Sequence, residues 1–114
     1  MKDNKEEFII CAAIHYRDGQ AYKEQPKNIE NGIVIAGRRH NNCFMTLEQL
    51  KPDYDVNLIE HKDFGFITSH DNFVTRAEGF KIAQAQNQFW HNMYREGEDN
   101  ILTSEDLYIY KGEY

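Results

Sequence analysis

One stretch decides the fold expected for this chain: Phe8-Ile9-Ile10-Cys11-Ala12-Ala13-Ile14-His15-Tyr16. This nearly continuous apolar run is too short for a typical capped helix, and such runs are typical of strands at the centre of a sheet. The dipeptide Asp18-Gly19 follows at once and favours a tight turn, because glycine adopts positive φ angles without steric cost. We therefore expect residues 20–25 to return as the partner strand of a first hairpin.

A second β-branched run, residues 32–37, is bounded by glycines and is predicted to be a buried strand. Asn41 and Asn42 come soon after it, in a position from which their side chains can cap a helix over residues 43–51. Pro52 ends that helix, because proline cannot continue the helical hydrogen bonds. The mixed polar stretch that follows, residues 53–63, is expected to be a loop.

The next segment predicts a second hairpin, with strands over residues 64–69 and 73–75. The tetrapeptide Thr75-Arg76-Ala77-Glu78 has the spacing of a capping box, in which the threonine and glutamate side chains satisfy each other's backbone amides. We expect a longer helix to run from there to about Arg95, with Gly97 ending it. Residues 107–110 are expected to form a last short strand or an ordered tail.

Length and charge limit the class of protein. A chain of 114 residues is one domain, and we expect a charged segment over residues 1–7 followed by a single α+β domain over residues 8–114. The predicted architecture is a small antiparallel sheet built from hairpins, with one short and one long helix packed on it. The net charge of −6 argues against binding to duplex nucleic acid, which requires a dense basic face. No apolar run is long enough to span a membrane and the N-terminus does not look like a signal sequence, so we expect a cytoplasmic protein.

Cysteine and histidine give no sign of a metal or a cofactor. Cys11 and Cys43 are too few and too far apart for a zinc motif, and we expect two buried or half-buried thiols. The five histidines are scattered, without the spacing that places metal ligands on one face of a helix. We therefore expect no metal and no cofactor.

The first candidate binding cluster is Arg38-Arg39-His40, between the strand at residues 32–37 and the helix after it. A helix N-terminus offers unpaired amides and partial positive charge, and arginine adds bidentate recognition, so these residues suit a phosphate or a carboxylate. Alternatively, Arg38 and Arg39 pair with surface acids on an ordinary loop. His40 could also act as a general acid or base beside two arginines.

The second candidate cluster combines Thr68 and Ser69 with Phe73 and Arg76. An aromatic ring at the edge of an anion site can stack on a base while an arginine holds a phosphate. The structural alternative makes Phe73 a core residue and Arg76 a solvated one. A third cluster around Ser104 can supply hydrogen bonds to a ligand, or it can be an ordinary turn.

The order of these motifs resembles a family of small proteins encoded mostly by phages and prophages. The resemblance covers nearly the whole chain after residue 8 and rests on residues 37–40, 65–69, 73–78 with Ile82, Ala83 and Gln88, and 102–108. It implies similarity to phage anti-defence proteins that sequester nucleotide immune signals, such as the cyclic ADP-ribose products of the Thoeris system or the cyclic oligonucleotides of CBASS. Such a protein would act in the cytoplasm of the bacterial host, and binders of this kind are often symmetric homo-oligomers.

Three functions are therefore considered. The first is a non-enzymatic protein that binds a nucleotide-derived ligand through Arg38, Arg39, His40 and Arg76, with Phe73 as a stacking residue and with Thr68, Ser69 and Ser104 as hydrogen-bonding residues. The second is an acidic protein that inhibits a host defence enzyme, which the net charge of −6 suggests. The third is a small phosphodiesterase that uses His40.

Overall fold

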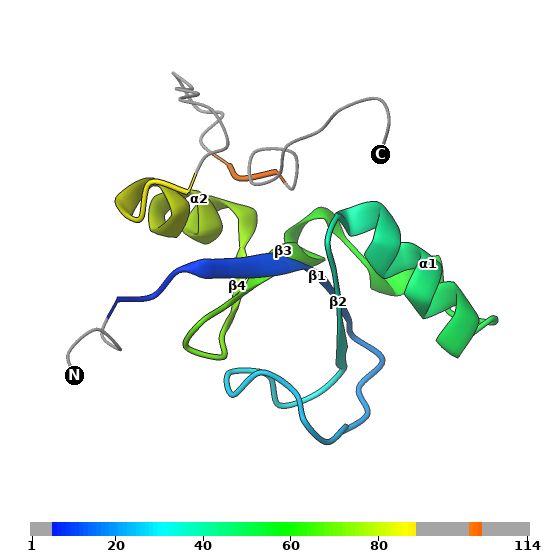
Figure 1. The fold of residues 1–114 in the computed structure, drawn as a ribbon. Helices are drawn as coiled ribbons and strands as arrows, with labels where there is room; N and C mark the ends of the chain where they lie inside the picture. The colour runs from blue at the N-terminus through cyan, green and yellow to red at the C-terminus, as the bar shows by residue number, and fades with distance from the viewer. Residues whose placement is uncertain (1–5, 89–100, 104–114) are drawn as a thin grey trace.

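The computed structural model describes residues 6–88 and 101–103 of the chain. Four strands form one antiparallel sheet, in the order β2-β1-β3-β4. Two α-helices and two short 3₁₀ turns complete the described part (Figure 1). The elements are β1 (Ile9–Tyr16), β2 (Ile33–Gly37), α1 (His40–Leu50), η2 (Val56–Leu58), η3 (His61–Asp63), β3 (Phe64–Thr68), β4 (Phe73–Thr75) and α2 (Arg76–Ala85). This architecture confirms the predicted α+β class, the predicted strand over residues 32–37 and the second hairpin.

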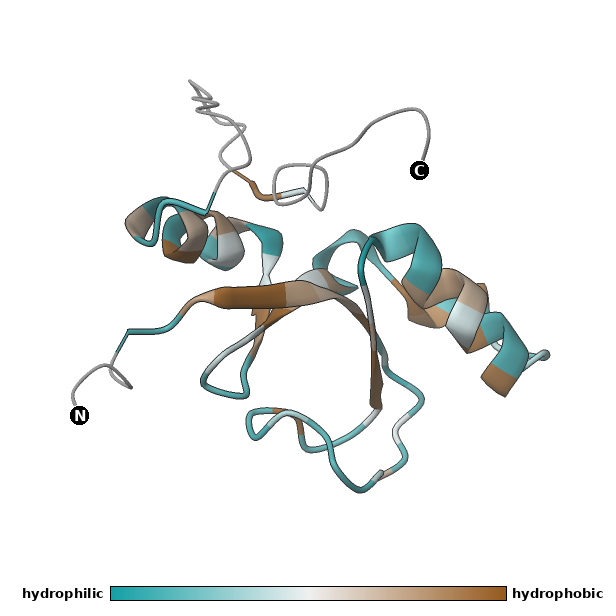
Figure 2. Cartoon of the chain, viewed as in Figure 1, coloured by the Kyte–Doolittle hydropathy of each residue, from teal (hydrophilic) through white to brown (hydrophobic). Residues whose placement is uncertain are grey.

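The core lies between one face of the sheet and both helices. Alternate residues of the central strand β1, among them Ala12 and Ile14, are fully buried and share one hydrophobic cluster with Leu47 of α1 and Phe80 of α2. Because successive strand residues point to opposite faces, this cluster places both helices on the same side of the sheet. The strands carry most of the hydrophobic colour in Figure 2.

The predicted first hairpin is wrong. The antiparallel partner of β1 is β2, and residues 17–32 form a long connection without a strand. The Asp18 carboxylate explains the difference, because it accepts hydrogen bonds from the Gln20 amide at 3.0 Å and from the Tyr22 hydroxyl at 2.5 Å. The polar groups after the turn are thus satisfied locally, and the chain does not pair back onto β1.

The 17–32 connection packs against the second hairpin. The Lys27 amide donates to the Asp71 carbonyl at 2.8 Å, and the Asn28 side chain binds both the amide and the carbonyl of Phe73, each at 2.8 Å. In Figure 1 this cyan connection lies beside the green turn between β3 and β4. The connection therefore covers part of the sheet face opposite the helices.

Helix α1 begins three residues earlier than predicted, at His40. Arg39 is its N-cap residue, and the Asn42 side chain accepts a hydrogen bond from the Arg39 amide at 3.1 Å. Asn42 therefore lies in the first turn of the helix and caps it by accepting a hydrogen bond from the backbone of the N-cap residue. It does not precede the helix, as the sequence pattern predicted. His40 consequently lies inside the helix and not in the loop that precedes it.

Helix α2 begins at Arg76, as the capping box predicted. The Thr75 hydroxyl accepts from the Glu78 amide at 3.1 Å, and the Glu78 carboxylate accepts from the Thr75 amide at 2.9 Å. The helix ends at Ala85, well before the predicted end at about Arg95. Its end is fixed because Asn87 has a φ angle of 56°, which leaves the helical conformation, and because the Gln88 side chain hydrogen-bonds both backbone groups of Ile9. The predictions that concern residues 89–95, Gly97 and residues 107–110 lie outside the described residues.

Candidate anion-binding site

Three basic side chains surround the ring of Phe64, the first residue of β3. The His61 ring stacks on it with 6.2 Å between centroids, and the guanidinium carbon of Arg76 lies 5.5 Å from the ring centroid. The His40 ring lies on it as well, with 5.5 Å between centroids. We call these four residues the Phe64 cluster. The sheet brings them together because the starts of α1, α2 and β3 and the turn η3 all meet at this end of the fold.

Arg76 is held by His61. One terminal guanidinium nitrogen of Arg76 donates to the His61 carbonyl at 3.2 Å and lies 3.3 Å from His61 Nδ1. A guanidinium has donors only, so Nδ1 accepts and the proton of a neutral His61 ring is on Nε2. The backbone and the ring of His61 therefore hold the Arg76 guanidinium in place.

A pocket of about 210 Å³ opens beside this pair. We call it the α2 pocket, because it lies at the N-terminus of that helix, where partial positive charge favours an anion. The ammonium of Lys62 lies 3.8 Å from the Glu60 carboxylate, but both side chains are exposed, so this ion pair is weak. Three of the six residues that line the pocket are basic and none is acidic: His61, Lys62, Thr75, Arg76, Ala77 and Ile101.

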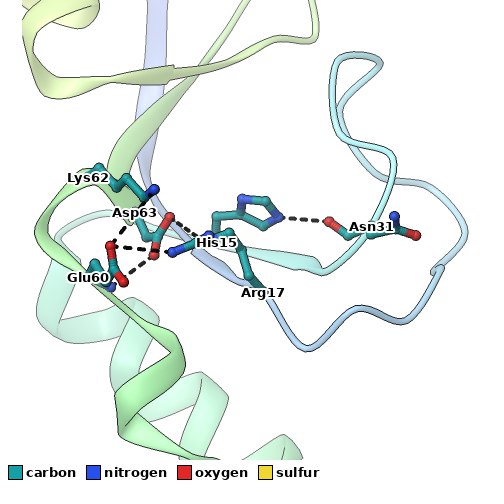
Figure 3. Close-up of polar contacts among 6 residues, drawn as sticks. All are labelled: His15, Arg17, Asn31, Glu60, Lys62 and Asp63. Atoms are coloured by element: carbon teal, nitrogen blue, oxygen red, sulfur yellow. Dashed lines mark hydrogen bonds and ion pairs between the residues drawn. The ribbon is translucent and has the colours of Figure 1, made fainter.

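An ion pair between a buried aspartate and a partly exposed arginine positions the turn that carries His61 and Lys62. Nε of Arg17 lies 2.9 Å from Asp63 Oδ1, and the other carboxylate oxygen of Asp63 accepts from the Glu60 amide at 2.9 Å (Figure 3). Asp63 is only 3% exposed, and Arg17 also lies 3.6 Å from the Glu60 carboxylate. We call the Arg17–Asp63 pair the η3 latch, because it ties η3 to the end of β1.

Arg38, Arg39 and His40 lie at the junction between β2 and α1. Arg38 is exposed and Arg39 is half-buried. His40 packs against Phe64 and Phe66, and its Nε2 donates to the Gly65 carbonyl at 2.9 Å. Burial, followed by the charges of Arg76 and Arg39, lowers the pKa of His40, although the hydrogen bond to Gly65 opposes this shift. His40 therefore supports the cluster as a neutral ring.

Thr68 and Ser69 lie at the other end of β3, about 13 Å along the strand from Phe64. Thr68 is 1% exposed, and its hydroxyl donates to the Glu7 carboxylate and accepts from the His70 amide. The Ser69 hydroxyl accepts from the Phe8 amide at 3.0 Å. These side chains organise the turn between β3 and β4, so they do not meet the arginines.

Phe73 is 9% exposed and packs against His15, with 5.7 Å between ring centroids. In this arrangement a ligand has no access to a face of the Phe73 ring, and the aromatic ring beside Arg76 is the half-buried Phe64 instead. Ser104 lies outside the described residues. Of the residues singled out from the sequence, the structure thus brings together His40 and Arg76, with Arg39 close enough to affect the pKa of His40.

Sequence reasoning missed His61, Lys62 and Phe64, because all three lie in or beside a stretch expected to be an unstructured loop. The available local signal was the pair of adjacent bases His61-Lys62, which is separated by one residue from the aromatic strand start at Phe64. The η3 latch joins residues far apart in the chain and leaves no local pattern.

Both cysteines are free, with Cys43 buried and Cys11 half-buried as predicted, and burial raises the pKa of the Cys43 thiol to about 12.

Within residues 6–88 and 101–103, no three His, Cys, Asp or Glu side chains are grouped so that they could hold a metal ion. Among the same residues, no helix has the length and apolar content needed to cross a membrane.

Fold and site together define a small α+β protein with a basic pocket at one end of its sheet. The chain belongs to the Phage T4 y16D protein family, whose model matches residues 8–108. This match confirms the resemblance to a small phage-encoded family. No curated protein and no solved structure matches the chain.

Proposed function

We propose that this protein binds and sequesters a nucleotide-derived signalling molecule without cleaving it, and thereby acts as a phage anti-defence protein. The observation that carries the proposal is the α2 pocket, in which His61, Lys62 and Arg76 meet the N-terminus of α2. Such an arrangement suits a phosphate group, because charge-assisted and bidentate hydrogen bonds from arginine add to the partial positive charge of the helix N-terminus. The ring of His61, the exposed aromatic residue of the Phe64 cluster, offers a face on which a base can stack.

The side chains near the pocket favour binding over catalysis. His40, the candidate general base, donates Nε2–H to a carbonyl and is packed between two phenylalanine rings. Nδ1 of His61 is already occupied by Arg76. A sequestering protein needs neither a free base nor a metal, so these engaged histidines are compatible with it.

The size of the pocket favours an oligomer. Pockets that enclose small ligands have volumes of about 300 to 1,000 Å³, and the α2 pocket has about 210 Å³. One chain therefore encloses only part of a nucleotide. We propose that two or more copies complete the site around a cyclic ADP-ribose type ligand or a cyclic oligonucleotide in the host cytoplasm.

Isothermal titration calorimetry with cyclic ADP-ribose and with a cyclic dinucleotide tests the proposal. We expect binding of at least one of them, and we expect Arg76→Ala and Arg39→Ala each to weaken it at least about tenfold. Lys81→Ala is the matched control, because Lys81 is an exposed base on the same helix outside the pocket. Normal binding by both arginine variants, or no binding by the unaltered protein, would refute the assignment.

A further inference from the structure

A second pocket among the described residues is larger than the α2 pocket. It has a volume of about 460 Å³, within the range of about 300 to 1,000 Å³ typical of small-molecule sites. It lies where the end of β1 meets the end of α1, and we call it the Tyr54 pocket. Its lining residues are Tyr16, Asp18, Gln20, Leu50, Lys51, Pro52, Asp53 and Tyr54.

Four of the eight lining residues are apolar or aromatic: Tyr16, Leu50, Pro52 and Tyr54. Tyr54 meets Tyr16 edge to face, with 6.1 Å between ring centroids, and the Tyr16 hydroxyl accepts from the Asp55 amide at 2.9 Å. Leu50 is 59% exposed, although it is a large apolar side chain in a helix that packs on the core. The contacts of Tyr16 therefore fix the aromatic part of the lining, and Leu50 leaves apolar surface that a ligand can cover.

The rest of the lining carries two carboxylates and one ammonium group, for a net charge of −1. Burial opposes ionisation of Asp18, but hydrogen bonds from Tyr22 and Gln20 and the charge of Lys51 outweigh it and lower the pKa of Asp18. The Lys51 ammonium is engaged nearby, 5.6 Å from the Tyr22 ring centroid. Within the pocket, Asp53 thus adds a carboxylate that Lys51 does not balance.

From this lining we propose that the Tyr54 pocket binds a small organic cation, in which an ammonium or guanidinium group is attached to an aromatic or aliphatic body. The cationic group lies between the carboxylates of Asp18 and Asp53, and the body packs on Leu50 and Tyr54. This site is separate from the α2 pocket, because the two share no lining residue and have opposite charge. The inference does not depend on the function proposed above.

A matched pair of probes tests the charge preference. Tyramine and 4-hydroxyphenylacetate have the same phenol ring but carry an ammonium and a carboxylate, respectively. Amide chemical shifts of the isotope-labelled full chain are followed during each titration. We expect tyramine to shift residues 16–20 and 50–54 with a Kd on the order of 1 mM, as expected for a ligand of this size, and 4-hydroxyphenylacetate to bind at least about fivefold more weakly.

Two variants and a control complete the test. Asp53→Asn and Tyr54→Leu are each expected to weaken tyramine binding at least about fivefold. The first removes a carboxylate that pairs with the ammonium group, and the second removes an aromatic ring on which the phenol packs. Asp71→Asn is the control, since Asp71 is an exposed aspartate in the turn between β3 and β4, where its φ of 65° suits asparagine. Equal binding of both probes, shifts elsewhere in the chain, or unchanged binding by folded Asp53→Asn and Tyr54→Leu would overturn the proposal.

Discussion

His40 illustrates how burial decides the charge of a side chain next to the site. Its ring lies between Phe64 and Phe66, and its Nε2 donates to the Gly65 carbonyl. Burial and the positive charges of Arg76 and Arg39 disfavour the protonated ring, so the pKa of His40 lies below its ordinary value. Protonation of His40 is therefore coupled to unfolding.

This coupling predicts a pH dependence of stability. Because the unfolded chain binds this proton more readily than the folded protein, His40 should reduce the free energy of unfolding as the pH falls from about 6.5 through the lower pKa of the folded state. Urea unfolding at about pH 7.5 and about pH 5.5 measures the difference between these conditions. In His40→Gln, which cannot be protonated, that difference should shrink. A variant with the unaltered pH dependence would contradict the assignment.

Gly65 is required because the Phe73 ring and β4 lie against it. A Cβ atom at this position would lie 2.1 Å from the Val74 carbonyl oxygen and 2.8 Å from Phe73 Cζ. We expect Gly65→Ala to lower the free energy of unfolding by about 2 to 3 kcal/mol, measured by urea unfolding. Gly19→Ala is the control, with no atom within 4 Å and only the cost of a φ of 80°, about 1 kcal/mol. Equal losses in the two variants would show that the contact is unimportant.

At the scale of elements, the η3 latch decides where His61 and Lys62 lie. We expect Arg17→Met to lower the free energy of unfolding by about 2 to 3 kcal/mol, because it leaves the Asp63 carboxylate buried without its ion pair. The loss is smaller than for a fully buried pair, since the Arg17 side chain is 38% exposed. Chemical unfolding measures it.

Lys62→Met is the matched control for the latch. It breaks an ion pair between exposed partners, so its effect should stay within about 0.5 kcal/mol. If Arg17→Met were as stable as Lys62→Met, the latch would not hold the turn.

Elements marked by local signals were predictable from the sequence. The capping box placed the start of α2 at Arg76, and Pro52 correctly indicated the end of α1. The partner of β1 was not predictable in this way, because the Asp18-Gly19 turn signal concerns only neighbouring residues. Pairing of β1 with β2 depends on the intervening connection, whose Gln25 side chain accepts from the Val34 amide at 2.8 Å.

Part of the candidate site was predictable, because local signals in the sequence mark the helix starts that carry two of its residues. Arg76 and His40 stand at helix starts that the sequence marks, so their basic character near helix N-termini was visible. Their meeting at Phe64 was not, because it requires the register of β3 and β4, in which Gly65 pairs with Thr75 and so brings Arg76 back beside Phe64. The remote latch between Arg17 and Asp63 adds His61 to this group.

The two pockets of the protein lie at different places in the fold and have opposite charge. The start of α2 and the turn η3 line the basic α2 pocket, and the acidic Tyr54 pocket lies at the end of α1. An overall charge of −6 is thus compatible with an anion site, because the basic side chains are concentrated locally.

The proposed oligomer is a property of the whole molecule and can be measured without a ligand. We expect size-exclusion chromatography with light scattering to give at least twice the chain mass of 13.5 kDa. The reason is that a pocket of about 210 Å³ must be completed by another copy to enclose a nucleotide. A mass of one chain, both alone and with saturating ligand, would contradict this prediction.

The central claim is that the α2 pocket retains a nucleotide-derived molecule intact, and native mass spectrometry tests it most directly. The purified protein is mixed with a panel of cyclic nucleotides and ADP-ribose derivatives, and the spectra report oligomer size and bound mass together. We predict a discrete added mass that is released chemically unchanged on denaturation and is absent from Arg76→Ala. No adduct with any member of the panel, or release of a cleaved product, would contradict the claim.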